Sequence, residues 1–397
     1  MAEAQRLSER ALERRVKRWL ASGPHECFVQ CAPGLEGTLV RELRQLGFSP
    51  QEPVTGGVPL ELDGPGIMTA NLRLRSASRV LLRLGNFPGG SREMLYDRAR
   101  RLPWENHLGF RGLYRLHMVA SSSWLQAGDE LKQIIHDAIS RRLEQHGLQA
   151  GYSDEAELEV HVRLLNDHCT VSLNTSGEHL HKRGFRRCIG EAPLRETVAA
   201  AAVLEAWDGH DLIHDPFCGA GTLLLEAADL VSGLAPGRAR SFAFEHAAWF
   251  RPGQWREVQR QAALIPAADP QPQLSGADLS AEAASAAARN LEAAGHAQVQ
   301  LTTADALEPG ALQDLPGERR LLLSNLPWGR RLGDERSTRE LLEKFARQLA
   351  GSGRWDFMLL TTQPEVLQRT RGLKISSVTR VQSGGLKISM IKGRTAG

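Results

Sequence analysis

The stretch Asp215-Pro216-Phe217-Cys218-Gly219-Ala220-Gly221-Thr222 decides the fold of the second half of the chain. It follows a short apolar segment, residues 212–214, and precedes residues 222–230, whose apolar side chains recur at helical spacing. Glycines at 219 and 221 let backbone N–H groups approach a ligand, and the start of the next helix favours an anionic group. A strand, a glycine turn and a helix in this order indicate a nucleotide-binding unit of an α/β sheet.

Acidic residues stand at the ends of three successive predicted strands, at Asp215, Asp278 and Asp305. Asp215 suits the amino group of a methionine-like moiety, Asp278 both hydroxyls of a ribose, and Asp305 an adenine amino group. Each acid alone could merely cap a helix, but three at successive strand ends indicate S-adenosylmethionine. No lysine follows the glycines as in a phosphate-binding loop, which disfavours a nucleoside triphosphate. The predicted cofactor contacts are Asp215, Pro216, Phe217, Gly219, Gly221, Thr222, Asp278 and Asp305.

A second motif, Asn325-Leu326-Pro327-Trp328, follows another apolar segment. The side-chain oxygen of Asn325 and a nearby backbone carbonyl can accept both hydrogens of an amino group, and Trp328 can stack on the ring that bears it. The alternative is a strand-ending asparagine beside a core tryptophan. Beside the glycine motif, we predict instead that Asn325, Pro327 and Trp328 are catalytic residues for methyl transfer to an exocyclic amine.

The two halves of the chain differ in their predicted folds. From residue 192 onward strands and helices alternate, which predicts a doubly wound, Rossmann-like α/β domain with a parallel sheet. Its last strands are predicted at 357–360 and 386–391, as an antiparallel edge pair. The first half is predicted to be an α+β region with an antiparallel sheet. Its predicted strands are 27–31, 58–62, 114–119, 157–165 and 170–175, and its main helices 35–46 and 129–146.

Composition and charge exclude several classes of protein. The 397 residues include no apolar run of membrane-spanning length, and the charged N-terminus lacks the apolar core of a signal peptide, so we expect a cytoplasmic protein. Five cysteines without a C-x-x-C pair predict neither a disulfide framework nor a metal site. Residues 1–190 hold 26 Lys and Arg against 22 Asp and Glu, a basic excess that fits contact with phosphates. Residues 2–22 read as a basic helix, better explained as a solvated cap than as an RNA-contacting arm.

These motifs resemble those of a known family. Asn325-Leu326-Pro327-Trp328 is similar to the [N/D/S]-P-P-[Y/F/W] motif of class I S-adenosylmethionine-dependent amino-methyltransferases. The stretch from Thr175 to Arg186, followed by Ala192-Pro193-Leu194-Arg195-Glu196-Thr197, resembles the junction of the THUMP-domain RNA guanine-N2-methyltransferases. Residues 28–47, with the Ala32-Pro33-Gly34 turn, are similar to the ferredoxin-like element of that family, and Ala235-Pro236-Gly237-Arg238 also fits it.

The resemblance implies a domain organisation and further site residues. It implies a basic helix at 1–24, a ferredoxin-like element at 25–66, a THUMP RNA-binding domain at 67–176 and a methyltransferase domain at 177–397. The segment Arg195-Glu196-Thr197 is expected to flank the cofactor pocket. Basic residues beside the junction and the active-site mouth are candidate phosphate contacts, although each could equally be a solvated charge. They are Lys182, Arg183, Arg186, Arg187, Arg330 and Arg331.

The implied reaction is N2-methylation of a guanosine in structured RNA. Leu326 replaces the first proline of the motif, as in family members that act on tRNA, whereas the Ala235-Pro236-Gly237-Arg238 stretch and the length resemble the branch that acts on large-subunit ribosomal RNA. Ribosomal RNA is therefore the expected substrate and tRNA the first alternative. Two further alternatives remain, an adenine-N6 methyltransferase and a non-catalytic RNA-binding or assembly factor. The target nucleotide, the number of methyl groups and the oligomeric state stay open.

Overall fold

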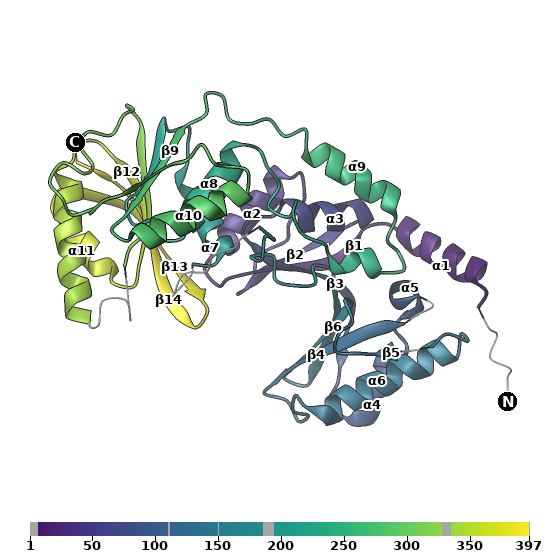
Figure 1. Ribbon diagram of the computed structural model, residues 1–397. Coiled ribbons are helices and arrows are strands. Elements are labelled where there is room, and N and C mark those ends of the chain that lie inside the picture. The colour runs from purple at the N-terminus through teal and green to yellow at the C-terminus, as the bar shows by residue number, and fades with distance from the viewer. Residues whose placement is uncertain (1–6, 110–111, 150, 186–193, 328–334, 397) are drawn as a thin grey trace.

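The computed structural model describes residues 7–109, 112–149, 151–185, 194–327 and 335–396. Two seven-stranded sheets, one in each half of the chain, carry the fold (Figure 1). The first has the strand order β2-β1-β3-β7-β6-β4-β5 and the second β10-β9-β8-β11-β12-β14-β13. Among the described residues, no helix combines the length and apolar character needed to cross a bilayer.

The first sheet is continuous across the first half of the chain, because β3 pairs with β1 on one side and with β7 on the other. The strands are β1 His25–Cys31, β2 Gly57–Leu62, β3 Ala77–Pro88, β4 Leu113–Ser121, β5 Gly151–Tyr152, β6 Glu159–Leu165 and β7 His168–Asn174. The helices are α1 Glu9–Ala21, α2 Glu36–Gln45, α3 Gly64–Arg73, α4 Arg92–Arg100, α5 Glu105–Leu108 and α6 Asp129–Glu144.

The predicted antiparallel sheet is wrong in one detail. Strand β4 runs parallel to β6 and to β5, whereas β2, β1, β3, β7 and β6 pair antiparallel in turn. The chain leaves β4 through helix α6 before it returns to the sheet. Such a helical crossover brings the next strand back in the same direction, which a two-residue hairpin cannot do.

The two faces of the first sheet differ in chemistry. Alternate residues such as Val80, Leu82 and Val160 are buried in one cluster with side chains of α2, α3, α4 and α6, so this face is the helix-covered core. The opposite side of β3, β7, β6 and β4, here named the polar face, carries charged and polar residues. They are Arg79, Arg83, Ser172, Glu159, His161, Arg163, Arg115 and His117.

Helix α1 packs onto the first half of the chain instead of standing free. Leu12 and Val16 are buried, while most of the remaining side chains are exposed or half-buried. Arg15 pairs with the buried Glu105 at 3.0 Å, and the ring of Trp19 stacks on His25 with centroids 3.8 Å apart. The helix therefore closes the end of the core near α5.

The second half is the predicted α/β domain. Strands β10, β9, β8, β11 and β12 are parallel, and β14 joins β12 antiparallel. The strands are β8 Leu212–Asp215, β9 Gln273–Asp278, β10 Gln300–Thr303, β11 Arg320–Asn325, β12 Asp356–Thr361, β13 Leu373–Ser383 and β14 Leu386–Thr395. The helices are α7 Glu196–Ala206, α8 Thr222–Val231, α9 Pro252–Ala262, α10 Ala281–Ala293, α11 Glu335–Ala350 and α12 Pro364–Arg369, with the short 3-10 turn η1 Ala243–His246.

The end of this sheet differs from the prediction. Residues 357–360 and 386–391 do pair antiparallel, as part of β12 and β14, but they are not the edge. The edge strand is β13, whose polar, largely exposed residues gave no strong apolar signal in the sequence. A strand at the edge of a sheet buries less of its surface, so its sequence pattern is weaker.

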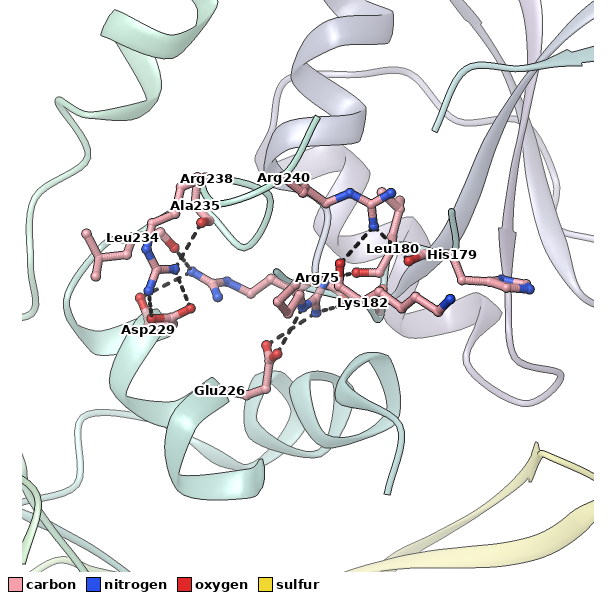
Figure 2. A network of polar contacts seen from close by, with 12 residues as sticks. Arg75, His179, Leu180, Lys182, Glu226, Asp229, Leu234, Ala235, Arg238 and Arg240 are labelled. Atoms are coloured by element: carbon pink, nitrogen blue, oxygen red, sulfur yellow. Dashed lines mark hydrogen bonds and ion pairs between the residues drawn. The ribbon is translucent and has the colours of Figure 1, made fainter. Parts of the chain in front are cut away.

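Buried charges join the two halves (Figure 2). Arg183, only 2% exposed, donates to both carboxylate oxygens of Glu226 on α8, at 3.0 and 3.3 Å, and to the backbone oxygen of Arg75 at 2.7 Å. Arg75 lies between α3 and β3 and donates to the backbone oxygens of Asp229 and Leu234. The loop before β3 is therefore tied directly to the helix that follows the glycine turn.

Candidate active site

The glycine turn between β8 and α8 has the backbone geometry that the sequence predicted. Gly219 and Gly221 have φ values of +53° and +78°, in the left-handed region that favours glycine. A Cβ at Gly221 would lie 3.0 Å from the Cβ of Ala287 on α10, whereas a Cβ at Gly219 would meet nothing within 4 Å. A side chain at Gly221 would therefore strain the backbone and crowd α10, whereas Gly219 borders open space in which a ligand can approach the backbone.

Asp215, the last residue of β8, is fully enclosed. Its Oδ1 accepts hydrogen bonds from the hydroxyl of Ser324 at 2.6 Å and from the backbone N–H of Phe217 at 3.1 Å. Burial raises the pKa of Asp215 to about 7, although these two hydrogen bonds act to lower it, and the charge of Asp278 raises it further. A cation beside this carboxyl, such as the ammonium of a methionine moiety, would stabilise the charged form.

Asp278 and Asp305 lie at the ends of the next two strands in space, as predicted. Asp278 accepts the backbone N–H of Gly219 at 2.9 Å through Oδ2 and that of Ser280 at 3.0 Å through Oδ1. Each carboxylate oxygen retains a second lone pair, so the side chain can still accept ribose hydroxyls. The Oδ1 of the half-buried Asp305 accepts the backbone N–H of Leu307 at 2.9 Å.

The second motif meets the first at the end of β11. Ser324, the residue before Asn325, makes the hydrogen bond to Asp215, so the predicted acceptor turn adjoins the predicted cofactor turn. Leu326 is fully buried, and its N–H donates to the backbone oxygen of Leu360 at 3.0 Å. Pro327 is half-buried. Trp328, Arg330 and Arg331, as well as Arg186 and Arg187, lie outside the described residues.

Helix α7 supplies one wall of a small cavity beside the glycine turn. Glu196 lines it with Arg183, Phe185, Ala220, Thr222, Leu225 and Asn290. Thr197 is buried in the same helix, and Arg195 is the exposed residue that precedes it. Pro216 is buried, while the Phe217 ring packs edge-on against Phe345 of α11 at 5.0 Å. The predicted cofactor residues are therefore gathered around one edge of the sheet.

Two supporting residues were missed in the sequence. Asn290 on α10 donates to the backbone oxygen of Ala220 at 3.0 Å and holds the glycine turn from the side. Ser324 orients the Asp215 carboxyl. Neither belongs to a spaced motif, although Ser324 directly precedes Asn325 and could have been suspected from that position.

The two described basic residues of the junction that were predicted to contact phosphates differ in their exposure. Lys182 is exposed and pairs with Glu178, four residues earlier in the chain. The prediction for Arg183 is wrong, because this side chain is buried and its guanidinium is bonded to Glu226 and to backbone oxygens. In a run of basic residues the sequence alone does not distinguish the one that faces inward. The cysteines at 27, 31, 169 and 218 are buried.

Parallel strands that present a glycine turn and three acids at their carboxyl edge, followed by an antiparallel β14, define a class I methyltransferase domain. Residues 183–389 match the RMKL-like methyltransferase domain, and residues 26–81 match the RlmL ferredoxin-like domain. The chain belongs to the RMKL-like methyltransferase family, and its cofactor is S-adenosylmethionine.

Individual relatives agree with this assignment. The ribosomal RNA large subunit methyltransferase K/L of Hahella chejuensis is 32% identical over 91% of this chain, which spans only 52% of that protein. YpsC of Bacillus subtilis, provisionally named an RNA methyltransferase, is 28% identical over 89% of this chain and 92% of its own.

Two solved structures have the same fold over nearly the whole chain. SMU.472, crystallised with S-adenosylhomocysteine, superposes with a TM-score of 0.82 at 28% identity, over 94% of this chain and 98% of its own. A Listeria monocytogenes protein described as a predicted N6-adenine-specific DNA methylase gives 0.83 at 26% identity, over 94% and 97%.

Proposed function

We propose that the protein transfers a methyl group from S-adenosylmethionine to the exocyclic N2 amine of a guanosine in structured RNA, with large-subunit ribosomal RNA as the substrate. The observation that carries the proposal is the Ser324–Asp215 hydrogen bond, 2.6 Å long, because it fixes the acceptor turn beside the cofactor turn. The ribosomal RNA large subunit methyltransferase name of the Hahella relative supports the choice of RNA.

Each acidic side chain at the carboxyl end of the second sheet would bind a different part of the cofactor. Asp215 would take the amino group of the methionine moiety, Asp278 the ribose hydroxyls and Asp305 the adenine amine. The residues fit such a ligand, because Gly219 leaves its side of the turn free and Asp215 is a buried carboxyl without a cationic partner among the described ion pairs. The bound cofactor supplies an activated methyl group on a sulfonium.

Asn325 would orient the acceptor. Its side-chain oxygen and a neighbouring backbone carbonyl accept the two amine hydrogens, which directs the nitrogen lone pair at the methyl carbon. The cofactor would supply the methyl carbon and keep the electron pair of its C–S bond, and water would take the proton that the acceptor nitrogen loses. No strong base is required, so positioning is the main catalytic effect. Trp328 would stack on the guanine after the base leaves its helix.

Nucleoside analysis distinguishes this proposal from its alternatives. Purified protein is incubated with methyl-labelled S-adenosylmethionine and with total RNA separated into ribosomal and transfer fractions, and the digested nucleosides are identified. We expect N2-methylguanosine from the ribosomal fraction. The same nucleoside from the transfer fraction would establish the tRNA alternative, which the Leu326 substitution favours.

The second alternative is methylation of an adenine N6 amine, which the Listeria structure's description favours. Label in N6-methyladenosine would contradict the guanosine proposal. A protein that binds S-adenosylmethionine in calorimetry but labels neither base in either fraction would contradict both, and one that binds RNA without binding the cofactor would be an assembly factor.

A further inference from the structure

The strands of the polar face carry four arginines, Arg79, Arg83, Arg115 and Arg163, against one glutamate, Glu159. On the neighbouring strand β1, Glu26 also acts electrostatically on Arg83. Arg79 and Arg83 of β3 and Arg163 of β6 take part in no ion pair among the described residues, and Glu159 is the single acid between them on β6 and β7. Arg83 instead donates to the Ser172 hydroxyl at 2.8 Å and lies over the Phe28 ring. Arg163 is exposed, and Arg79 and Arg83 are half-buried. An excess of arginine on one partly exposed face is typical of a phosphate-binding surface.

Arg79 is the strongest single indication. Its Nε is buried and has no hydrogen-bond partner, so one donor of a permanently charged group is left unsatisfied. Burial lowers the pKa of Arg79, while Glu159 and Glu178 act in the opposite direction from a distance. A polar group in this state is usually satisfied by a ligand or a water when the protein is at work.

The pKa values of the neighbouring histidines His179 and His181 are lowered in part by nearby arginines. Burial lowers the pKa of His179 to about 4, and the charges of Arg79 and Arg195 lower it further. The pKa of His181 is also about 4, chiefly through burial, with Arg195 contributing. Both imidazoles are therefore neutral near pH 7 and leave the positive charge to the arginines.

A metal site is the competing explanation, because the ligand atoms of His117, Glu159 and His161 all lie within 4.8 Å of one another. The carboxylate of Glu159, however, already accepts from His161 at 2.6 Å, from Asn174 at 3.0 Å and from Arg115 at 3.0 Å. A divalent cation would have to displace these donors beside the charges of Arg79 and Arg115. Anion binding requires no such displacement.

The polar face is connected to the methyltransferase domain. His179 stacks on His181 with ring centroids 5.3 Å apart, and Arg195, at the start of α7, acts electrostatically on both. The guanidinium of Arg195 also lies near Gly384, in the turn between β13 and β14. A row of basic and imidazole side chains thus leads from β3 to the helix that flanks the candidate cofactor site.

We propose that the polar face binds the backbone phosphates of the RNA substrate, with Arg79, Arg83 and Arg163 as the principal contacts, and that His179, His181 and Arg195 continue this track to the active site. The inference rests on the proposed function, since it assigns to that RNA a specific surface. Backbone contacts of this kind set the register of the RNA, while the pocket chooses the base.

The test compares two double variants that remove the same charge. Arg79→Gln/Arg163→Gln changes the polar face, and Arg98→Gln/Arg141→Gln changes exposed residues of α4 and α6 on the helical side of the same sheet. Binding of purified ribosomal RNA is measured between 50 and 300 mM salt. Each phosphate contact contributes about 0.7 to 0.9 to the slope of log Kd against log salt. The slope measured for the first variant should therefore be about 1.4 to 1.8 smaller than that of the wild type, and its affinity at low salt about tenfold weaker.

Further readouts separate this inference from the proposed function. The polar-face variant should raise the KM for RNA while kcat and S-adenosylhomocysteine affinity stay as in the control variant. Equal salt slopes for both variants would overturn the inference even if guanosine is methylated. Stoichiometric zinc that is lost in His117→Ala, with RNA affinity unchanged, would assign the cluster to a metal instead. Polar-face dependence together with labelled adenosine would keep the surface and reject the guanosine proposal.

Discussion

Asp215 is a buried carboxyl whose two hydrogen-bond donors, Ser324 and the N–H of Phe217, do not compensate for its loss of water, so its pKa rises to about 7. The unfolded chain binds this proton only below about pH 4, near the ordinary value of 3.8. Between about pH 4 and pH 7 the folded state therefore holds the extra proton, and stability from this residue falls as the pH rises.

Asp215→Asn should remove the fall in folding stability that Asp215 causes as the pH rises. We expect the variant without cofactor to melt about 2–6 °C above the wild type at pH 8 and at the same temperature at pH 4. Its affinity for S-adenosylmethionine should fall about 10- to 100-fold, because the ammonium loses a charged partner. Melting by calorimetry at both pH values and titration with the cofactor measure these effects. A variant that binds as the wild type does would show that Asp215 does not contact the ligand.

Asn325→Ala tests the other side of the site. If positioning of the amine is the main catalytic effect, kcat should fall about 10²–10³-fold while the cofactor Kd stays within about twofold. Asn290→Ala is the contrasting variant, since it releases the Ala220 backbone and should weaken cofactor binding. Loss of both activity and cofactor binding in Asn325→Ala would make that residue structural.

Among the elements, α8 has a double role, because its first residue follows the glycine turn and its interior carries Glu226 and Asp229. Asp229 accepts two hydrogen bonds from Arg238, at 2.5 and 2.7 Å (Figure 2). It also accepts one from His296 at 2.6 Å, and Glu226 accepts one from Arg183 at 3.0 Å. These two carboxylates are buried and paired with cationic side chains. Removal of a partner would leave a buried charge uncompensated and so destabilise the folded protein.

Arg183→Met should destabilise the protein by about 3–5 kcal/mol, because it leaves the Glu226 carboxylate buried without its main partner. The double variant Arg183→Met/Glu226→Met removes both charges and should recover a large part of that loss. Urea unfolding of the single and double variants gives the coupling energy. Strictly additive losses would indicate that Arg183 acts through its backbone contacts rather than through Glu226.

The strand order explains which site residues could be located from the sequence and which could not. Asp215, Asp278 and Asn325 were placed together correctly, because parallel strands bring their carboxyl ends to one edge whatever the loops between them do. Arg183 was misplaced because its burial depends on Glu226, 43 residues away in the chain. The polar face was not foreseen, since it arises from pairings between β3, β7 and β6 that local patterns do not specify.

Over the whole molecule, the two sheets are joined at several separate points. The N–H of Gln382 on β13 donates to the backbone oxygen of Pro33 at 3.0 Å, and Thr38 on α2 bonds Glu205 on α7. Phe244 donates to Thr175 at 2.9 Å, near the end of β7. Together with the buried charges around Arg75, these contacts hold the first sheet at a defined place relative to the active site.

We therefore expect the protein to unfold in one cooperative transition, in which the calorimetric and van't Hoff enthalpies agree. Saturating S-adenosylhomocysteine should raise the temperature of this whole transition, including the unfolding of the first half, where Trp104 is fully buried. Two resolved transitions, of which the ligand moves only one, would mean that the halves are energetically independent.

The burial of Leu326 bears on how the motif should be compared among relatives. This side chain packs in the core, and its N–H bonds to Leu360 on β12, so a proline here would forfeit a hydrogen bond and have to repack its neighbours. Packing and backbone pairing inside the domain are therefore a second reason for a leucine at this position, besides the choice of RNA. Exchange of Leu326 for proline would need compensating changes in β12, where Leu360 would lose its hydrogen-bond donor.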